Sequence, residues 1–171
     1  MPPIPTAIIG LSASAITSWA SSARLPYLPS TRDRENYTIV ALCNSSVETA
    51  KRAIETYGLA PETRAYGDPR ALPDDTDIDL VVCCTRADVH HQSVLPRGKA
   101  GKIVFVEWPL AQDVAHARDL VAAVKTSGSR SLVGVQGRLS PAIVQLRKLL
   151  GHGRIGRVLS SEVKAFGGSM D

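Results

Sequence analysis

Short runs of apolar residues alternate along the chain with longer segments in which apolar residues recur every three or four positions. The short runs predict buried strands, and the periodic segments between them predict amphipathic helices. Strands are expected at Thr6–Ile9, Tyr37–Cys43, Ala65–Tyr66, Asp79–Cys84, Val104–Val106 and Leu132–Gln136. Regular alternation of strand and helix, joined by right-handed crossovers, predicts an α/β fold with a doubly wound parallel sheet, Rossmann-like.

Capping residues and helix breakers predict where the helices begin and end. Helices are expected over Ser12–Arg24, from Val47 to Gly58, from about Asp88 until Pro96 kinks or ends it, over Gln112–Ser127 with Gly128 closing it, and after Pro141. Ser45 and Glu48 have the spacing of a capping box. Ser140 is expected to cap the last helix, with Pro141 in its first turn.

Composition narrows the classes of protein to consider. Of the 171 residues, 44% are hydrophobic and 21% are charged, and the net charge of +4 comes from scattered Lys and Arg, which disfavours direct nucleic-acid binding. All three cysteines stand at the ends of apolar runs, and an odd number of cysteines in buried positions suggests reduced thiols in an intracellular protein. Cys83 and Cys84 are adjacent on a strand and therefore point to opposite faces, which disfavours a zinc site. The apolar N-terminal stretch lacks the charged opening of a secretory signal, so a cytoplasmic or nuclear location without membrane insertion is expected.

The strand over Val104–Val106 runs directly into Glu107, Trp108 and Pro109. An apolar run of this kind fits a central strand of a parallel sheet, because both faces of such a strand are covered. Ligands of open α/β sheets bind in the crevice at the carboxyl ends of the strands. Glu107 and Trp108 are therefore candidate ligand-binding residues.

The first strand meets a turn that partly fits a dinucleotide-binding pattern. In place of Gly-x-Gly-x-x-Gly the chain has Gly10-Leu11-Ser12-Ala13-Ser14-Ala15. Gly10 is kept and Ala15 is tolerated, but Ser12 adds a Cβ where the backbone would approach a pyrophosphate. A purely structural turn explains the same residues equally well.

Polar residues also follow the second and fourth predicted strands. Asn44 stands where an Asp or Glu would hold the ribose of NAD, and because an amide does not repel a 2′-phosphate, NAD and NADP are not separated. The alternative is that Asn44 is a turn residue before a helix cap. Thr85 and His90 follow the fourth strand, where His90 could face the crevice while His91 points elsewhere; the alternative for His90 is a solvated or capping role.

Several short motifs together resemble the N-terminal domain of the glucose-fructose oxidoreductase, inositol dehydrogenase and rhizopine-catabolism (Gfo/Idh/MocA) family. The matching residues are Thr85, His90, Glu107, Pro109, Arg138, Pro141, Gly153, Ile155 and Gly156, with Arg86 in place of a proline. The resemblance covers almost the whole chain. It implies NAD or NADP as cofactor, with Gly10, Ser12, Ala15, Asn44, Thr85, His90, Glu107 and Trp108 along the cofactor cleft.

Trp108 is the main departure from that family, which has a lysine between Glu and Pro that contacts nicotinamide and substrate. An indole has one donor and no useful pKa, so the resemblance implies weak or absent catalysis. The segment is similar to the fungal galactose-regulon repressors, a branch of the family in which the cofactor cleft is sensed by an acidic transcriptional activator. Two alternatives stay open: an active sugar or polyol oxidoreductase that tolerates Trp108, and a fold remnant that binds nothing.

Length is the second departure. Residues 158–166 alternate like a strand with one wet face, but no later strand is available to pair with it. The family resemblance therefore implies a dinucleotide-binding domain over residues 1–156, followed at 157–171 by the first strand of a truncated α/β second domain that packs poorly. The full-length form is expected to be a homo-oligomer.

Overall fold

The computed structural model describes residues 2–12, 19–26, 28 and 36–164. The chain divides into two compact units, residues 1–134 and 135–171. In the described part of the chain, no helix is both long enough and apolar enough to span a bilayer.

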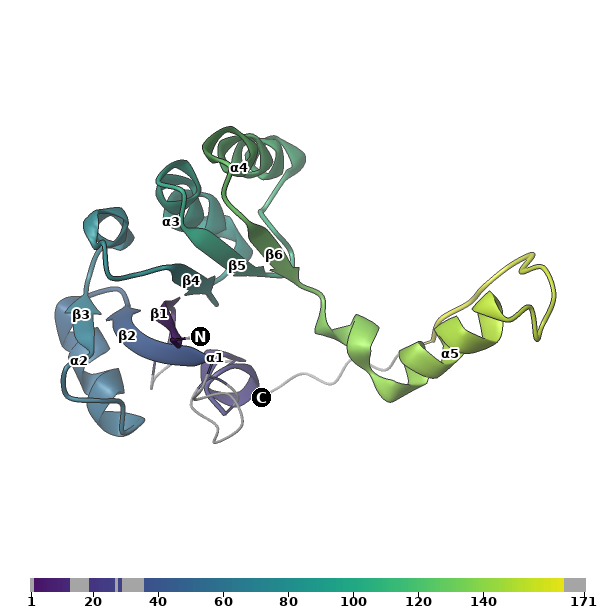
Figure 1. Cartoon of the computed structure of the whole chain (residues 1–171), viewed down its shortest axis with the longest axis horizontal. Coiled ribbons are helices and arrows are strands. Elements are labelled where there is room, and N and C mark those ends of the chain that lie inside the picture. Colours follow the sequence, from purple (N-terminus) through teal and green to yellow (C-terminus); the bar gives the residue numbers. More distant parts are fainter. Residues whose placement is uncertain (1, 13–18, 27, 29–35, 165–171) are drawn as a thin grey trace. The chain divides into compact units, whose positions relative to one another are not determined.

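The first unit contains a six-stranded sheet in which neighbouring strands are all parallel (Figure 1). Its strands are β1 (Ile4–Ile9), β2 (Tyr37–Cys43), β3 (Arg64–Tyr66), β4 (Leu80–Cys83), β5 (Ile103–Glu107) and β6 (Ser131–Gly134). They lie in the order β3-β2-β1-β4-β5-β6, so the direction of winding reverses between β1 and β4. The predicted doubly wound, Rossmann-like sheet is confirmed.

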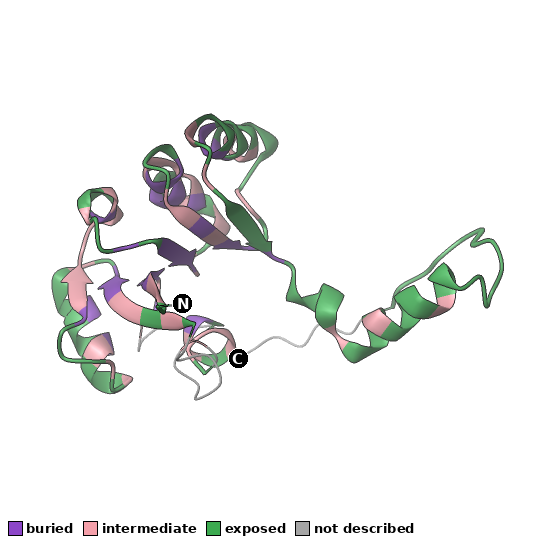
Figure 2. Cartoon of the chain, viewed as in Figure 1, coloured by how far each residue is buried: buried purple, intermediate pink, exposed green. Residues whose placement is uncertain are grey.

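Helices cover both faces of this sheet, with α3 and α4 on one side and α1 and α2 on the other (Figure 1). The elements are α1 (Trp19–Ala23), α2 (Val47–Thr56), the 3-10 helix η1 (Pro69–Asp74), α3 (Ala87–Lys99) and α4 (Val114–Ser127). Successive strand residues alternate between two buried layers, because side chains of a strand point to opposite faces. Ile9, Val81 and Val106 belong to the layer with α3 and α4, whereas Ile8 and Val82 belong to the layer with α1 and α2. Figure 2 shows buried positions on the central strands of the sheet, such as β4.

Two helix boundaries differ from the expectation. Ser46 rather than Ser45 caps α2: its Oγ accepts from Thr49 N at 3.2 Å, and Thr49 Oγ1 accepts from Ser46 N at 3.1 Å. Helix α3 continues through Pro96 to Lys99, since its buried residues pack against the sheet and α4, which outweighs the hydrogen bond that proline removes. Gly128, at φ 69°, ends α4 as predicted.

The second unit contains η2 (Gln136–Leu139) and α5 (Pro141–Gly151), with Ser140 as the predicted cap. Its apolar residues stay largely uncovered, Leu146 being 46% exposed and Leu159 86% exposed. The strand expected over residues 158–166 is wrong for the described part, because residues 158–164 form no strand. The physical reason is the one anticipated: an isolated strand has no backbone partner.

Candidate dinucleotide site

The carboxyl ends of four strands meet along one edge of the sheet. Register pairs Ile9 with Cys83 and Cys83 with Val106, so the segments that follow β1, β4 and β5 begin at the same level. Asn44 follows β2, which pairs with β1 up to Cys43. The structure thus brings the predicted Gly10, Asn44, Thr85, Glu107 and Trp108 to one edge, where the sheet reverses its winding.

Gly10, in the turn after β1, is hydrogen-bonded to the end of β2 and packs closely against the turn after β4. Its φ is 93°, and its N–H donates to Cys43 O at 3.0 Å. A Cβ at this position would lie 2.8 Å from Thr85 Cγ2 and 3.1 Å from Cys84 O, so only glycine fits. Ser12 is half-buried and non-helical, and Ala15 lies outside the described residues, as does most of the predicted helical segment before Trp19.

Asn44 is buried, with 8% of its surface exposed. Its Nδ2 donates to Leu11 O at 2.8 Å and to Thr49 O at 3.2 Å, and its backbone N–H donates to Tyr66 O at 3.0 Å. The side chain therefore ties the turn after β1 to α2. Its Oδ1, although buried, has no hydrogen-bond partner among the described residues, which leaves one acceptor for a donor from outside the protein.

His90 lies inside the protein and is only 1% exposed, which excludes the solvated role. Its Nε2 is 2.9 Å from Thr85 O, and its Nδ1 is 3.0 Å from Pro109 O. Thr85 in turn holds its Oγ1 3.3 Å from Cys83 Sγ. His90 thus connects the turn after β4 to the turn after β5 and holds the two turns together.

Glu107, at the end of β5, is 6% exposed and forms an ion pair with Arg24, which follows α1. The Arg24 guanidinium also lies over the Phe105 ring, 4.6 Å from its centroid. On the other side, a Cβ on Gly134 would lie 2.6 Å from Glu107 Oε2. The Glu107 carboxylate therefore lies between Gly134 of β6 and the Arg24 guanidinium. Arg24 was not predicted as a site residue, because no sequence spacing links residues 24 and 107.

Trp108 follows Glu107 and precedes Pro109 across a cis peptide bond. It is 62% exposed, so the indole is available at the rim rather than packed in the core. An indole can donate one hydrogen bond but cannot exchange a proton at neutral pH. The position next to Glu107 therefore carries no acid or base.

The cysteines near the rim are not nucleophiles. All three are free thiols, as predicted. Burial, and next the charge of Glu107, raises the pKa of the Cys84 thiol to about 12, and burial raises that of Cys43 to about 11. Over the described ranges, no group of three or more His, Cys, Asp or Glu side chains could hold a metal ion. The rim thus offers polar binding groups without a metal or a thiolate.

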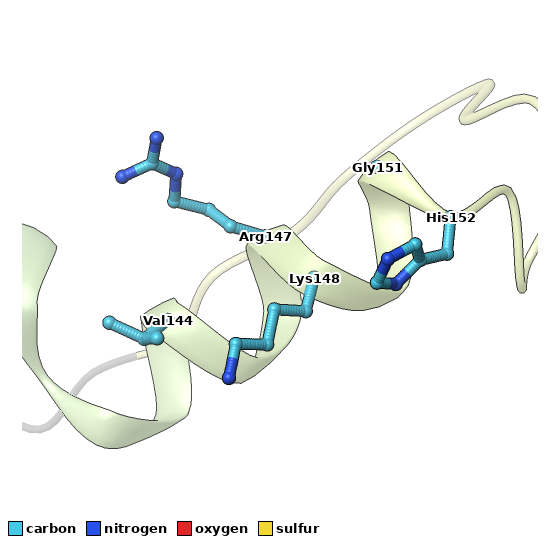
Figure 3. A pocket seen from close by; sticks show the side chains of 5 residues that line it. All are labelled: Val144, Arg147, Lys148, Gly151 and His152. Carbon is cyan, nitrogen blue, oxygen red and sulfur yellow. The ribbon is translucent and has the colours of Figure 1, made fainter.

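The second unit carries a separate depression on α5, lined by Val144, Arg147, Lys148, Gly151 and His152 (Figure 3). None of the residues predicted for the cofactor cleft lines it. Arg147 and Lys148 lie on α5, and His152 directly follows its last residue. The depression therefore adds positive charge to this unit but no catalytic grouping.

Comparison with known proteins agrees with the resemblance drawn from the motifs. Residues 5–135 match the family model described as oxidoreductase family, NAD-binding Rossmann fold (Gfo/Idh/MocA). Dehydrogenase aclE of Aspergillus oryzae is 33% identical over 156 residues, which are 91% of this chain and 42% of the relative. The galactose/lactose metabolism regulatory protein GAL80 of Saccharomyces cerevisiae is 27% identical over 97% of this chain and 38% of the relative.

Comparison with solved structures also finds members of this family. The crystal structure of a super-repressor mutant of Gal80p from Saccharomyces cerevisiae superposes with a TM-score of 0.80 at 26% identity, covering 91% of this chain and 40% of that one. The chain spans about two-fifths of the length of these relatives. The chain belongs to the Gfo/Idh/MocA oxidoreductase family, as an NAD-binding domain with the Rossmann fold.

Proposed function

We propose that this domain binds NAD or NADP across the sheet edge and uses the bound nucleotide for regulation rather than for turnover. Gly10, Ser12 and Ala15 form the phosphate turn. Asn44 faces the adenine ribose. The support for this half is the glycine-only contact at Gly10 and the buried Oδ1 of Asn44, which has no partner among the described residues and suits a ribose hydroxyl.

The nicotinamide half lies beyond the reversal of winding, over β4 and β5. Thr85 and His90 line this part of the cleft, and Glu107 holds the nicotinamide ribose beside Trp108. Bound NAD or NADP supplies hydride-transfer chemistry, while the protein positions it. The support is that the buried His90 ring lies within hydrogen-bonding distance of both Thr85 O and Pro109 O, next to Glu107.

Catalytic silence rests on one observation: the residue after Glu107 is an exposed indole. Trp108 offers no proton to a substrate carbonyl and takes none from a hydroxyl. Loss of a positioned acid or base costs roughly 10² to 10⁴ in rate. The similarity to the regulatory protein Gal80p supports a regulatory rather than an enzymatic role for this chain.

A regulator of this type needs a protein partner, and an acidic transcriptional activator in the nucleus or cytoplasm suits the charge of the second unit. Residues 135–164 contain six Lys and Arg residues but one acidic residue, Glu162. The basic side chains of Arg147 and Lys148 are exposed on α5. Acidic segments are attracted to such a surface.

An active sugar or polyol oxidoreductase is the second candidate. The 33% identity with dehydrogenase aclE supports it. In this case the proton comes from another residue, and Trp108 only packs against substrate. Steady formation of NADH or NADPH from a polyol panel by the full-length protein, lost in Glu107→Ala, would favour this candidate.

Calorimetric titration of the chain with NAD and with NADP tests binding, and a turnover assay of the full-length protein tests silence. We expect saturable binding without turnover. A matched Gly10→Val variant should lose binding, because its side chain enters the space of Thr85. Thermal unfolding unchanged by millimolar nucleotide would instead indicate a remnant that binds nothing.

A further inference from the structure

Arg24 and Glu107 form an ion pair at the end of β5, in the region proposed to bind the nicotinamide half of the dinucleotide. Both Nε and Nη2 of Arg24 contact Glu107 Oε1, and the guanidinium carbon lies over the Phe105 ring. The arginine side chain is 19% exposed and the glutamate side chain 8% exposed. The cation is therefore the outer member of the pair, and the carboxylate is the inner one.

The pair lies beside the ends of two strands. Phe105 and Cys84 pack in the same layer as Ala20 of α1, and the charges of Arg24 and Glu107 both act on Cys84. This region lies on the β4–β6 side of the reversal, opposite the side where β2 carries Asn44. A dinucleotide whose adenosine half sits over β2 places its other half here, because it crosses the sheet at the reversal.

The oxidised and reduced dinucleotides differ in this half alone. The oxidised nicotinamide ring carries a positive charge, and the reduced ring is neutral. A bare carboxylate at the end of β5 would attract the oxidised ring. With Arg24 on Glu107, the field of the carboxylate is cancelled, and an incoming ring meets the guanidinium before the carboxylate.

We propose that Arg24 is a specificity-determining residue that makes this site bind the reduced dinucleotide, NADH or NADPH, more tightly than the oxidised form. The proposal rests on the proposed dinucleotide site and deepens it: the nucleotide that is sensed is the reduced one. Because two like charges would approach within a partly desolvated site, the preference should be on the order of ten-fold.

Dissociation constants for NAD⁺ and NADH, measured at one pH and ionic strength, test this in four proteins: the unmodified chain, Arg24→Gln, Glu107→Gln, and the double variant. The unmodified chain should prefer NADH by about ten-fold, and Glu107→Gln should prefer it more strongly. Arg24→Gln should reverse the preference, because the carboxylate is then unpaired. The double variant, which buries no unpaired charge, should bind both forms within about two-fold.

Thermal unfolding of each variant shows whether it is folded. If Arg24→Gln is unstable, the dissociation constants of Glu107→Gln and of the double variant still test the proposal. Equal affinity of the unmodified chain for NAD⁺ and NADH would overturn the proposal for Arg24 and leave the dinucleotide site standing. If Arg24→Gln weakened the affinities for NAD⁺ and NADH equally, the proposal would also be overturned, and Arg24 would be a phosphate ligand. Absence of binding by either nucleotide would overturn both proposals.

Discussion

The imidazole Nδ1 of His90 lies 3.0 Å from the carbonyl oxygen of Pro109, on a different turn of the rim. The other ring nitrogen lies 2.9 Å from Thr85 O. One buried side chain therefore connects the turn after β4 with the turn that carries Glu107 and Trp108. The proposed position of the nicotinamide half depends on this connection.

Replacing His90 by Ala should destabilise the fold by roughly 2 kcal/mol or more, because at least one buried carbonyl group loses its donor and a cavity forms. Urea unfolding measures this change. His91→Ala is the matched control, since the side chain of His91 lies nearer the surface, 25% exposed. Equal losses in the two variants would show that His90 does not hold the rim together.

Gly134→Ala should displace the Glu107 side chain and weaken dinucleotide binding. The added Cβ would lie 2.6 Å from Glu107 Oε2 and 3.0 Å from Phe105 Cζ, closer than packing allows. Overpacking of this kind costs about 1 to 3 kcal/mol. Gly137→Ala, whose Cβ would meet nothing within 4 Å, is the control for both stability and affinity. Unchanged affinity in Gly134→Ala would contradict the role of Glu107.

Arg97→Met should leave the stability unchanged or raise it by up to about 4 kcal/mol. Arg97 is fully buried in α3, and its Nε and Nη2 have no hydrogen-bond partner among the described residues. Burial lowers its pKa to about 10, so the charge is still present at neutral pH and its desolvation is incompletely compensated. A marked loss of stability on chemical denaturation would show that the charge is compensated after all.

The carboxyl group of Asp75 should contribute stability that is lost in acid. Burial raises its pKa, but hydrogen bonds from the Tyr66 hydroxyl, the Asp77 N–H and Arg64 outweigh burial and hold the pKa below its usual value. A lowered pKa stabilises the fold above the unfolded value and stops doing so as the pH falls through the folded value. The stability gap between the unmodified chain and Asp75→Asn should therefore narrow as the pH falls below the ordinary aspartate pKa of about 4. A gap that persists there would contradict this linkage.

The sheet, and with it the edge proposed for binding, could be predicted from the sequence, because apolar runs such as Val104–Val106 bury both faces whatever their neighbours are. The end of α3 could not, since tertiary packing decided whether the helix continued past Pro96. Arg24 was missed for a related reason: its pairing with Glu107 joins α1 to β5 across the fold. The alternating pattern after Val158 does not form a strand over residues 158–164, because such a pattern needs a backbone partner, as the sequence already indicated.

Amide hydrogen exchange with and without saturating NADH tests most directly whether the carboxyl edge of the sheet is the dinucleotide site. We predict that binding slows exchange in the turns that follow β1, β2, β4 and β5, at residues 10–12, 44–46, 84–90 and 106–110, and changes it little in α4. Protection that appears in α5 or α4 but not in these turns would contradict it.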